Sequence, residues 1–338
     1  MRRAALLVVC ALAATLGLSG PLPAAAAPSS SPYTGWVDGA GEPCGAAEAL
    51  RWLDEGVAAA SKFFYDPSTD AWYWAEADGS IARDHDAYVP LSNGVDQELW
   101  LTDDAYRRAN GKWVRLGADG AMVKGESLSN GGWYYFDPIT GAMDFEWAYL
   151  PHANKWVYYD PVTGRMWYGQ HMVDGRPYYF DAVTGRKLEP AELRQRLVST
   201  AVSTYYTHPD CDAALREAGG TTCTYGPCMA YVWWVFHQAD LDIFLSDGQL
   251  LSGWPHDQFD WYKARGRVDR TPRPGDVVFF RFDGFATNLG LSASHAGIVV
   301  GTSGSYVLVA DAAYDSIEQR AWRMDSYMAG VAHPYWGD

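Results

Sequence analysis

The sequence has little positive charge: 26 lysine and arginine residues stand against 41 aspartate and glutamate residues, for a formal net charge of −15. A chain of that sign is repelled by nucleic acid and by anionic lipid surfaces. The eight histidines are scattered without metal-ligand spacing, and no glycine-rich phosphate loop follows a predicted strand. We therefore expect no nucleic-acid partner and infer no metal and no cofactor.

Long apolar runs are missing except at the N-terminus. Met1-Arg2-Arg3 is a basic start, residues 4–18 are apolar, and Ala24-Ala25-Ala26 supplies small residues. This order is typical of a secretory signal peptide, and the run is shorter than the roughly 20 residues of a spanning helix. We expect a signal peptide at residues 1–26 and a secreted protein without membrane contact after cleavage. The alternative is a buried N-terminal helix.

Cysteine is also scarce, and Cys10 leaves with the signal peptide. Cys211 and Cys223 bracket a short loop and are predicted to form a local disulfide. That pairing leaves Cys228 free for chemistry and Cys44 without an obvious partner. The alternative, a bridge between Cys44 and Cys228, would abolish any thiol activity.

Aromatic residues are abundant, with 16 tryptophans and 22 tyrosines. Residues 133–141 recur as 156–164 and as 177–185, each an aromatic run followed by Asp and then Thr-Gly. We interpret the run as a strand and the Asp-to-Gly stretch as a turn, followed by a second short strand such as residues 165–168. The regular period predicts stacked hairpins, an all-β, solenoid-like module over residues 62–188.

The rest of the chain is divided by composition. Residues 27–61 are predicted as a leader rich in Ser, Pro and Gly with a possible helix at 46–60. Residues 189–338 begin with a predicted helix at 190–206 and continue with helices first and strands later. That order predicts an α+β domain.

A candidate nucleophile lies in this last domain. Gly226-Pro227-Cys228 introduces an apolar helix, and the unpaired N–H groups of a helix start favour a thiolate. The alternative is a cysteine buried in the core. Further on, His295 begins an apolar strand, where a general base for the thiol is held in a fixed orientation.

A third candidate follows from strand register. If residues 301–305 form a turn of three or five residues, Asp311 lies directly opposite His295 and orients its imidazole. A connection of two or four residues would instead place Ala312 opposite. The alternative is that Asp311 and Asp315 are ordinary turn acids.

The aromatic units resemble the cell-wall-binding repeats of Gram-positive surface proteins, of the choline-binding and glucan-binding type. The resemblance implies that aromatic rings of successive repeats enclose a choline headgroup by cation–π contacts or stack on sugars. The alternative is that the rings only pack one hairpin on the next. The residues expected to bind a wall ligand are Trp133, Tyr135, Trp156, Tyr158, Trp167 and Tyr179.

The C-terminal motifs resemble those of CHAP domains and the related NlpC/P60 hydrolases. They are Gly-Pro-Cys at a helix start, Pro-x-Pro-Gly-Asp before an apolar strand, and Ser-His-Ala-Gly-Ile-Val. The resemblance implies a papain-like fold with Cys228 as nucleophile and His295 as base. One departure is Ala310-Asp311-Ala312 where many CHAP members carry Glu-x-Asn.

Together these features predict a cysteine amidohydrolase of the cell wall or cell surface. Its partners would be peptidoglycan and a wall polymer such as choline-bearing teichoic acid or glycan. It would act as an N-acetylmuramoyl-L-alanine amidase or as a crossbridge or stem-peptide endopeptidase. Two alternatives remain: a non-catalytic wall-binding adhesion protein that retains the fold, and a thiol transpeptidase or acyltransferase.

Overall fold

The computed structural model describes residues 37–38, 62–66, 69–92, 95–217, 227–248, 253–282, 284, 289–313, 315–325 and 327–337. The predicted signal peptide, the possible helix at 46–60, Cys44 and Cys223 lie outside these ranges. Contacts divide the chain into two compact units, residues 1–125 with 136–143, and residues 126–135 with 144–338. Within the described ranges, every helix is too short or too polar to cross a membrane.

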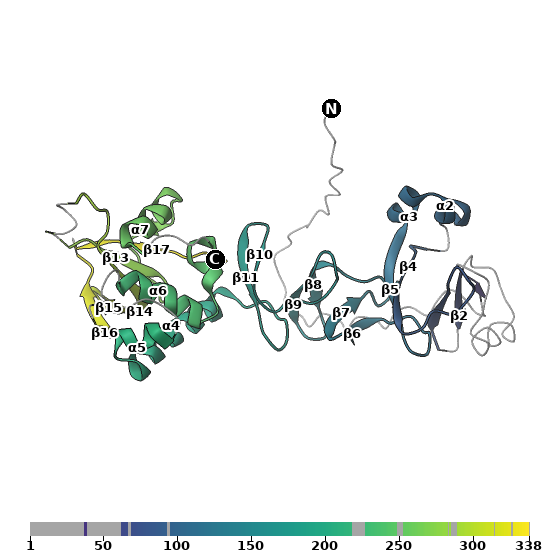
Figure 1. Ribbon diagram of the computed structural model, residues 1–338, viewed down its shortest axis with the longest axis horizontal. Helices are drawn as coiled ribbons and strands as arrows, with labels where there is room; N and C mark the ends of the chain where they lie inside the picture. Colours follow the sequence, from purple (N-terminus) through teal and green to yellow (C-terminus); the bar gives the residue numbers. More distant parts are fainter. Residues whose placement is uncertain are drawn as a thin grey trace, which may run out of the picture. The chain divides into compact units, whose positions relative to one another are not determined.

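The first unit contains two groups of paired strands (Figure 1). One is a three-stranded antiparallel sheet that includes two residues of the predicted leader, and the other is a hairpin. The sheet consists of β1 (Val37–Asp38), β2 (Lys62–Asp66) and β3 (Ala71–Ala75), and the hairpin of β4 (His85–Pro90) and β5 (Gly111–Leu116).

The repeat module is not all-β, which corrects the prediction. Helices α2 (Gln97–Thr102) and α3 (Asp104–Ala109) lie in the connection between β4 and β5. Each has an aspartate cap: Asp96 accepts from the Leu99 N–H, and Asp103 accepts from the N–H groups of Ala105 and Tyr106. These caps satisfy backbone donors that would otherwise lack partners, so the segment folds as helices.

Three further hairpins follow, with bounds β6 (Gly125–Ser129) and β7 (Gly132–Phe136), β8 (Glu146–Leu150) and β9 (Lys155–Tyr159), and β10 (Gly169–Val173) and β11 (Arg176–Phe180). Each aromatic run is the second strand of its hairpin and pairs with the strand before it. The predicted second strand at residues 165–168 is therefore wrong, since only Met166 forms a bridge, to Tyr159.

The Asp-to-Gly turn explains why no second strand follows the aromatic run. The Asp160 carboxylate accepts from the N–H groups of Val162 and Thr163 and from the Thr163 hydroxyl, which closes a compact turn. The chain then reaches back to the preceding hairpin, where the Met166 N–H donates to the Trp133 carbonyl at 2.8 Å. Lys187 repeats the pattern by donating to the carbonyl of Trp156.

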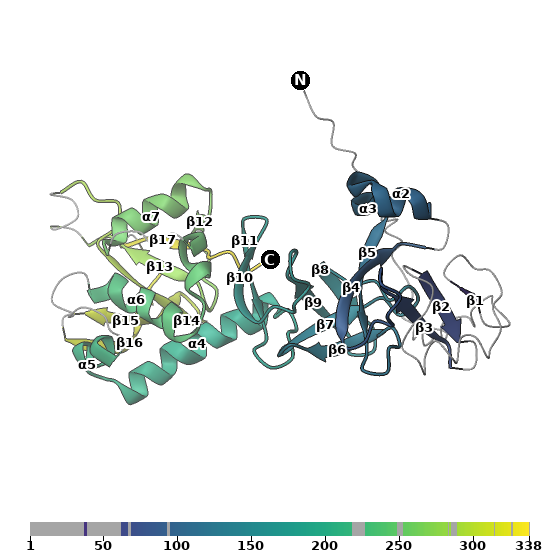
Figure 2. The same ribbon diagram turned by 45° about the vertical axis from the view of Figure 1, so that its right-hand side comes forward.

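The second unit also contains the predicted α+β region (Figure 2). Its helices are α4 (Pro190–Thr207), α5 (Cys211–Glu217), α6 (Pro227–Gln238), the short 3₁₀ helix η1 (Asp242–Gly248) and α7 (Pro255–Ala264). Its strands are β12 (Val268–Asp269), β13 (Val277–Phe280), β14 (His295–Ser303), β15 (Tyr306–Ala313), β16 (Ser316–Arg323) and β17 (Met328–Ala332). They form one six-stranded antiparallel sheet in the order β12-β17-β13-β14-β15-β16.

The main core lies between helices and sheet. Helix α4 starts as predicted at Pro190, with a capping box between Glu189 and Glu192, and buries Leu193 and Leu197. Helices α4 and α6 contact β14 and β15. Burial of a side chain such as Leu197 contributes roughly 1.5–3 kcal/mol. This packing fixes the start of α6 beside the central strands.

The Pro-Gly-Asp motif before β13 has a structural role. Asp276 is fully buried and pairs with Arg194 of α4 at 2.8 Å and with His333 after β17 at 3.0 Å. An added Cβ at Gly275 would lie 3.2 Å from the Arg194 Cα, so α4 packs closely on this turn. The motif thereby joins the first helix, the sheet and the C-terminal segment.

Candidate active site

Cys228 is the second residue of α6 and a free thiol with 4% exposure. Cys211 is disulfide-bonded, and its predicted partner Cys223 lies outside the described residues. The free thiol rules out the alternative bridge between Cys44 and Cys228. Pro227, which lacks a backbone N–H, opens the helix.

His295 is the first residue of β14 and pairs in the sheet with Phe280 of β13. Its Nε2 lies 2.7 Å from Oδ2 of Asp311, whose side chain is fully buried. The Cys228 thiol is also near enough to this imidazole to contribute to the shift of its pKa. The structure therefore brings the three predicted residues into one chain of contacts.

The charge state of His295 follows from these contacts. Burial alone would lower the pKa of His295, but the hydrogen bond to Asp311 and the interaction with Cys228 outweigh it and raise this pKa to about 9. The imidazole is thus protonated at neutral pH.

The strand register differs from the prediction. The strands run on to Ser303 and Tyr306, so the connection has only two residues, and a bulge lies between Val299 and Gly301. The next pair, Ile298 with Ala310, places Asp311 beside position 297 and not directly opposite His295. A two-residue connection alone would turn Asp311 away, but the bulge shifts the register by one residue and returns it to the face of His295.

Gly297 makes the diagonal contact sterically possible. An added Cβ there would lie 2.8 Å from the Asp311 Cβ and 2.4 Å from Val309 Cγ1, closer than real Cβ atoms approach. The glycine of the Ser-His-Ala-Gly motif therefore leaves the space in which Asp311 reaches His295.

Two residues of the site were not found from the sequence. Arg320 of β16 places Nε 3.4 Å from the second oxygen of Asp311. Tyr231, one turn after Cys228, is buried; burial, and then the charge of Asp311, raise the pKa of its hydroxyl. The only signal for Arg320 is the hairpin that pairs it with Val309, two residues before Asp311.

Aromatic rings surround the imidazole. The ring centroids of Phe280, Phe282 and Trp322 lie 6.2, 6.0 and 6.2 Å from that of His295. Phe282 and Trp322 were also not found from the sequence, because they lie on different segments that meet only in the folded domain. They give His295 an apolar surrounding.

The six residues predicted to bind a wall ligand divide into three pairs by exposure: exposed, partly buried and buried. Trp133 and Trp156 are 40% and 48% exposed, whereas Tyr135 and Trp167 are partly buried. Trp113, which was not predicted, is 44% exposed at the same repeat position, because its carbonyl accepts the Met143 N–H as that of Trp133 accepts the Met166 N–H.

Tyr158 and Tyr179 correct the prediction because both rings are buried. Tyr158 is 6% exposed and stacks on Trp167 with centroids 4.4 Å apart. Tyr179 is 3% exposed, donates to Asp240 at 2.8 Å and lies under the Arg196 guanidinium at 4.7 Å. These rings are occupied by protein contacts, and Tyr179 joins the last hairpin to the α+β region.

Comparison with protein families agrees with the C-terminal motifs and with the aromatic repeats. The CHAP domain model matches residues 218–313, which include all three site residues, and the choline-binding repeat model matches residues 106–144. The chain therefore carries a CHAP domain and a choline-binding repeat. No curated protein matches the chain.

Several solved structures are similar to part of the chain. Choline-binding protein F from Streptococcus pneumoniae is 26% identical over 39% of this chain and 36% of its own, with a TM-score of 0.29. The choline-binding domain of CbpL from Streptococcus pneumoniae is 27% identical over 39% of this chain and 68% of its own, with a TM-score of 0.21. This chain thus spans about a third of the length of choline-binding protein F.

Proposed function

We propose that this chain is a secreted cysteine amidohydrolase that cleaves an amide bond of peptidoglycan and is held on the cell wall by its aromatic repeats. The observation that supports this most is the chain of contacts from the free Cys228 thiol through His295 to the buried Asp311. The CHAP match over the same residues supports peptidoglycan as substrate. On this proposal, α6 and the sheet form a papain-like fold.

The first half-reaction is acyl transfer to sulfur. The Cys228 thiolate attacks the amide carbonyl while its proton resides on His295, and a C–S bond forms. The tetrahedral oxyanion is stabilised by the backbone N–H of Cys228 at the start of α6. Collapse breaks the C–N bond, and the imidazolium donates its proton to the leaving amine.

The second half-reaction releases the acid. Neutral His295 now removes a proton from water, which attacks the thioester and restores the thiol and a free carboxylate. Asp311 fixes the ring by its contact with Nε2, which leaves Nδ1 for proton transfer. Arg320 pairs with the other carboxylate oxygen of Asp311, with its Nε 3.4 Å away, and so helps to hold the carboxylate in place.

The wall-binding part of the proposal depends on exposed rings. Trp133 and Trp156 present open indole faces at equivalent positions of successive hairpins. Such faces bind quaternary ammonium groups by cation–π contacts and also stack on sugars. We therefore propose choline-bearing polymer or glycan as the ligand, and export by the N-terminal segment as the route to the cell surface.

The test is digestion of purified sacculi by the mature chain. We expect wild type to release new amino groups, and Cys228→Ala and His295→Gln to release none while still binding the wall. His237→Gln is the matched control, because His237 lies at the other end of α6 and pairs with Asp242. Mass spectrometry of the fragments then distinguishes amidase from endopeptidase products.

The same digest separates the alternatives. Equal inertness of wild type and Cys228→Ala, with wall binding retained, would identify an adhesion protein. New amide bonds to an added acceptor amine, without net release of amino groups, would identify a transpeptidase.

A further inference from the structure

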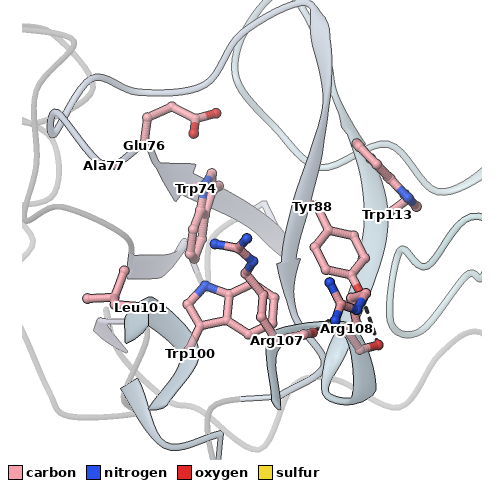
Figure 3. Close-up of a pocket in the computed structure, with 9 residues that line it drawn as sticks. All are labelled: Trp74, Glu76, Ala77, Tyr88, Trp100, Leu101, Arg107, Arg108 and Trp113. Atoms are coloured by element: carbon pink, nitrogen blue, oxygen red, sulfur yellow. Dashed lines mark hydrogen bonds between the residues drawn. The ribbon is translucent and has the colours of Figure 1, made fainter. Parts of the chain in front are cut away.

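The first unit contains a cavity, which we call the insertion pocket, with a volume of about 600 Å³. It lies between the strands of the β3 and β4–β5 region and the helices α2 and α3, and Figure 3 shows its side chains. Its wall combines four aromatic rings with two arginines and one glutamate. The lining residues used below are Trp74, Glu76, Tyr88, Trp100, Arg108 and Trp113.

The pocket depends on the helices α2 and α3 in the connection of the β4–β5 hairpin. Among the described hairpins only β4–β5 carries helices in its connection, whereas β6–β7 and β10–β11 have two-residue turns. The Tyr88 hydroxyl donates to the Arg108 carbonyl at 3.1 Å, and Trp100 of α2 is buried and stacked on Tyr88. The helices are therefore held against the hairpin, and the cavity is preformed.

The aromatic side of the pocket is continuous. Ring centroids of Trp100 and Tyr88 lie 5.7 Å apart, and those of Tyr88 and Trp113 lie 5.3 Å apart. Trp113 is well exposed, so part of its indole remains open to a ligand. A row of this kind suits the flat apolar faces of linked sugar rings.

The charges in the pocket oppose a cationic ligand. Glu76, the only acid of the lining, pairs with His85 at 2.9 Å, and this hydrogen bond raises the pKa of His85. Arg107 pairs with Asp104, but Arg108 forms no ion pair with any residue that the structure describes. In a chain of net charge −15, this is a local site where the Arg108 guanidinium and the exposed ring of Trp113 line the same cavity.

We propose that the insertion pocket binds an acidic saccharide, whose sugar ring stacks on Trp113 and Tyr88 and whose anionic group binds Arg108. Guanidinium groups bind carboxylate and phosphate in the same forked geometry. The anion therefore has two possible sources on a wall: the carboxylate of a muramic acid residue, or the phosphate of a teichoic acid. This site requires neither the Cys228 chemistry nor choline binding at the later hairpins.

The experiment is isothermal titration calorimetry of the mature full chain. The probes are the N-acetylglucosamine–N-acetylmuramic acid disaccharide, a glycerol phosphate polymer, neutral chitobiose and choline chloride. We expect an acidic probe to bind at least about tenfold more tightly than chitobiose at low ionic strength, with a smaller ratio at high salt. The acidic probe that binds identifies the source of the anion.

Two variants assign the binding to this pocket. Arg108→Gln should weaken the acidic probe about tenfold and leave chitobiose unchanged, and Trp113→Ala should weaken both. The matched controls are Arg216→Gln on α5, with the same change of charge, and Tyr206→Ala on α4, with the same loss of an exposed ring. Because Arg108 is exposed, its variant keeps the test valid even if Trp113→Ala does not fold.

Three results would overturn the proposal. They are equal affinity for chitobiose and the acidic probes, choline binding that Trp113→Ala abolishes and Arg108→Gln strengthens, and no binding of any saccharide at millimolar concentration. None of them depends on hydrolysis. Release of amino groups from sacculi by the same Arg108→Gln preparation shows separately whether the proposed enzyme is active.

Discussion

Asp311 lies across the β14–β15 ladder from Gly297, where an added Cβ would come within 2.8 Å of its own Cβ. The carboxylate reaches His295 diagonally, through the space that a side chain at 297 would fill. Gly297 is therefore a positioning residue of the proposed site. This steric requirement explains why the smallest residue follows His-Ala in the motif.

Gly297→Ala should displace Asp311 and lower kcat about tenfold or more. The overpacking against Val309 should also reduce the free energy of unfolding by about 1–3 kcal/mol. A loss of stability alone would leave the pH profile in place, whereas loss of the Asp311 contact lowers the pKa of His295 from about 9. The alkaline limb of kcat/KM should therefore move to lower pH.

The matched control for this variant is Gly301→Ala. A Cβ at Gly301 would meet only the Leu308 side chain, and its nearest atom, the flexible Cδ1, would lie 3.3 Å away. We expect near wild-type activity and an unmoved alkaline limb. If the two alanine variants behave alike, the steric role of Gly297 is wrong.

Asp311→Asn tests the carboxylate itself. Its hydrogen bond and charge are among the contributions that raise the pKa of His295 to about 9, so the neutral amide should return this pKa toward the ordinary 6.5. Fewer molecules then carry the imidazolium that protonates the leaving amine, and kcat at neutral pH should fall about 10²–10⁴-fold. The measurement is kcat/KM against pH, and an alkaline limb that stays near pH 9 would contradict the assignment.

Local patterns predicted the elements that carry the site. The apolar run at Val277–Phe280 and the spacing of Leu193 and Leu197 are visible in the sequence, and both elements are present. The common face of His295 and Asp311 was also predicted, but for the wrong reason. A bulge near Val300 compensates for a shorter turn, and neither is visible from strand periodicity.

Other features depend on contacts between distant segments. Tyr179 is buried against a distant segment, where the carboxylate of Asp240, 61 residues further along the chain, accepts a hydrogen bond from its hydroxyl. Sequence periodicity gives no information on such a partner. Helices α2 and α3 are different, since their capping residues Asp96 and Asp103 are visible in the sequence but were not recognised within the expected hairpin repeats.

A pair of variants should distinguish the buried aromatic residues, which stabilise the fold, from the exposed ones, which are proposed to bind the wall. Tyr179→Phe removes a hydrogen bond to the Asp240 carboxylate and should cost about 1–3 kcal/mol of unfolding free energy, with wall binding unchanged. Trp156→Ala removes an exposed ring and should weaken wall binding with little change in Tm. Calorimetry measures the stability of each variant, and a pull-down with sacculi measures its wall binding. The reverse result would place the wall ligand at the buried Tyr179 ring and contradict a structural role for this residue.

His333 should make stability depend on pH. Its ring nitrogens lie 3.0 Å from the Asp276 carboxylate and 2.9 Å from that of Asp269, and the interaction with Asp276 is the main cause that raises the pKa of His333 above 6.5. A group with a raised folded pKa contributes fully below the unfolded value and loses that contribution as pH rises through the folded one. The Tm difference between wild type and His333→Gln should therefore be largest below about pH 6.5 and shrink above it. His152→Gln, at an exposed turn, is the control. If the Tm difference between wild type and His333→Gln stayed constant from pH 5 to about pH 9, the ion pairs of His333 would not be its cause.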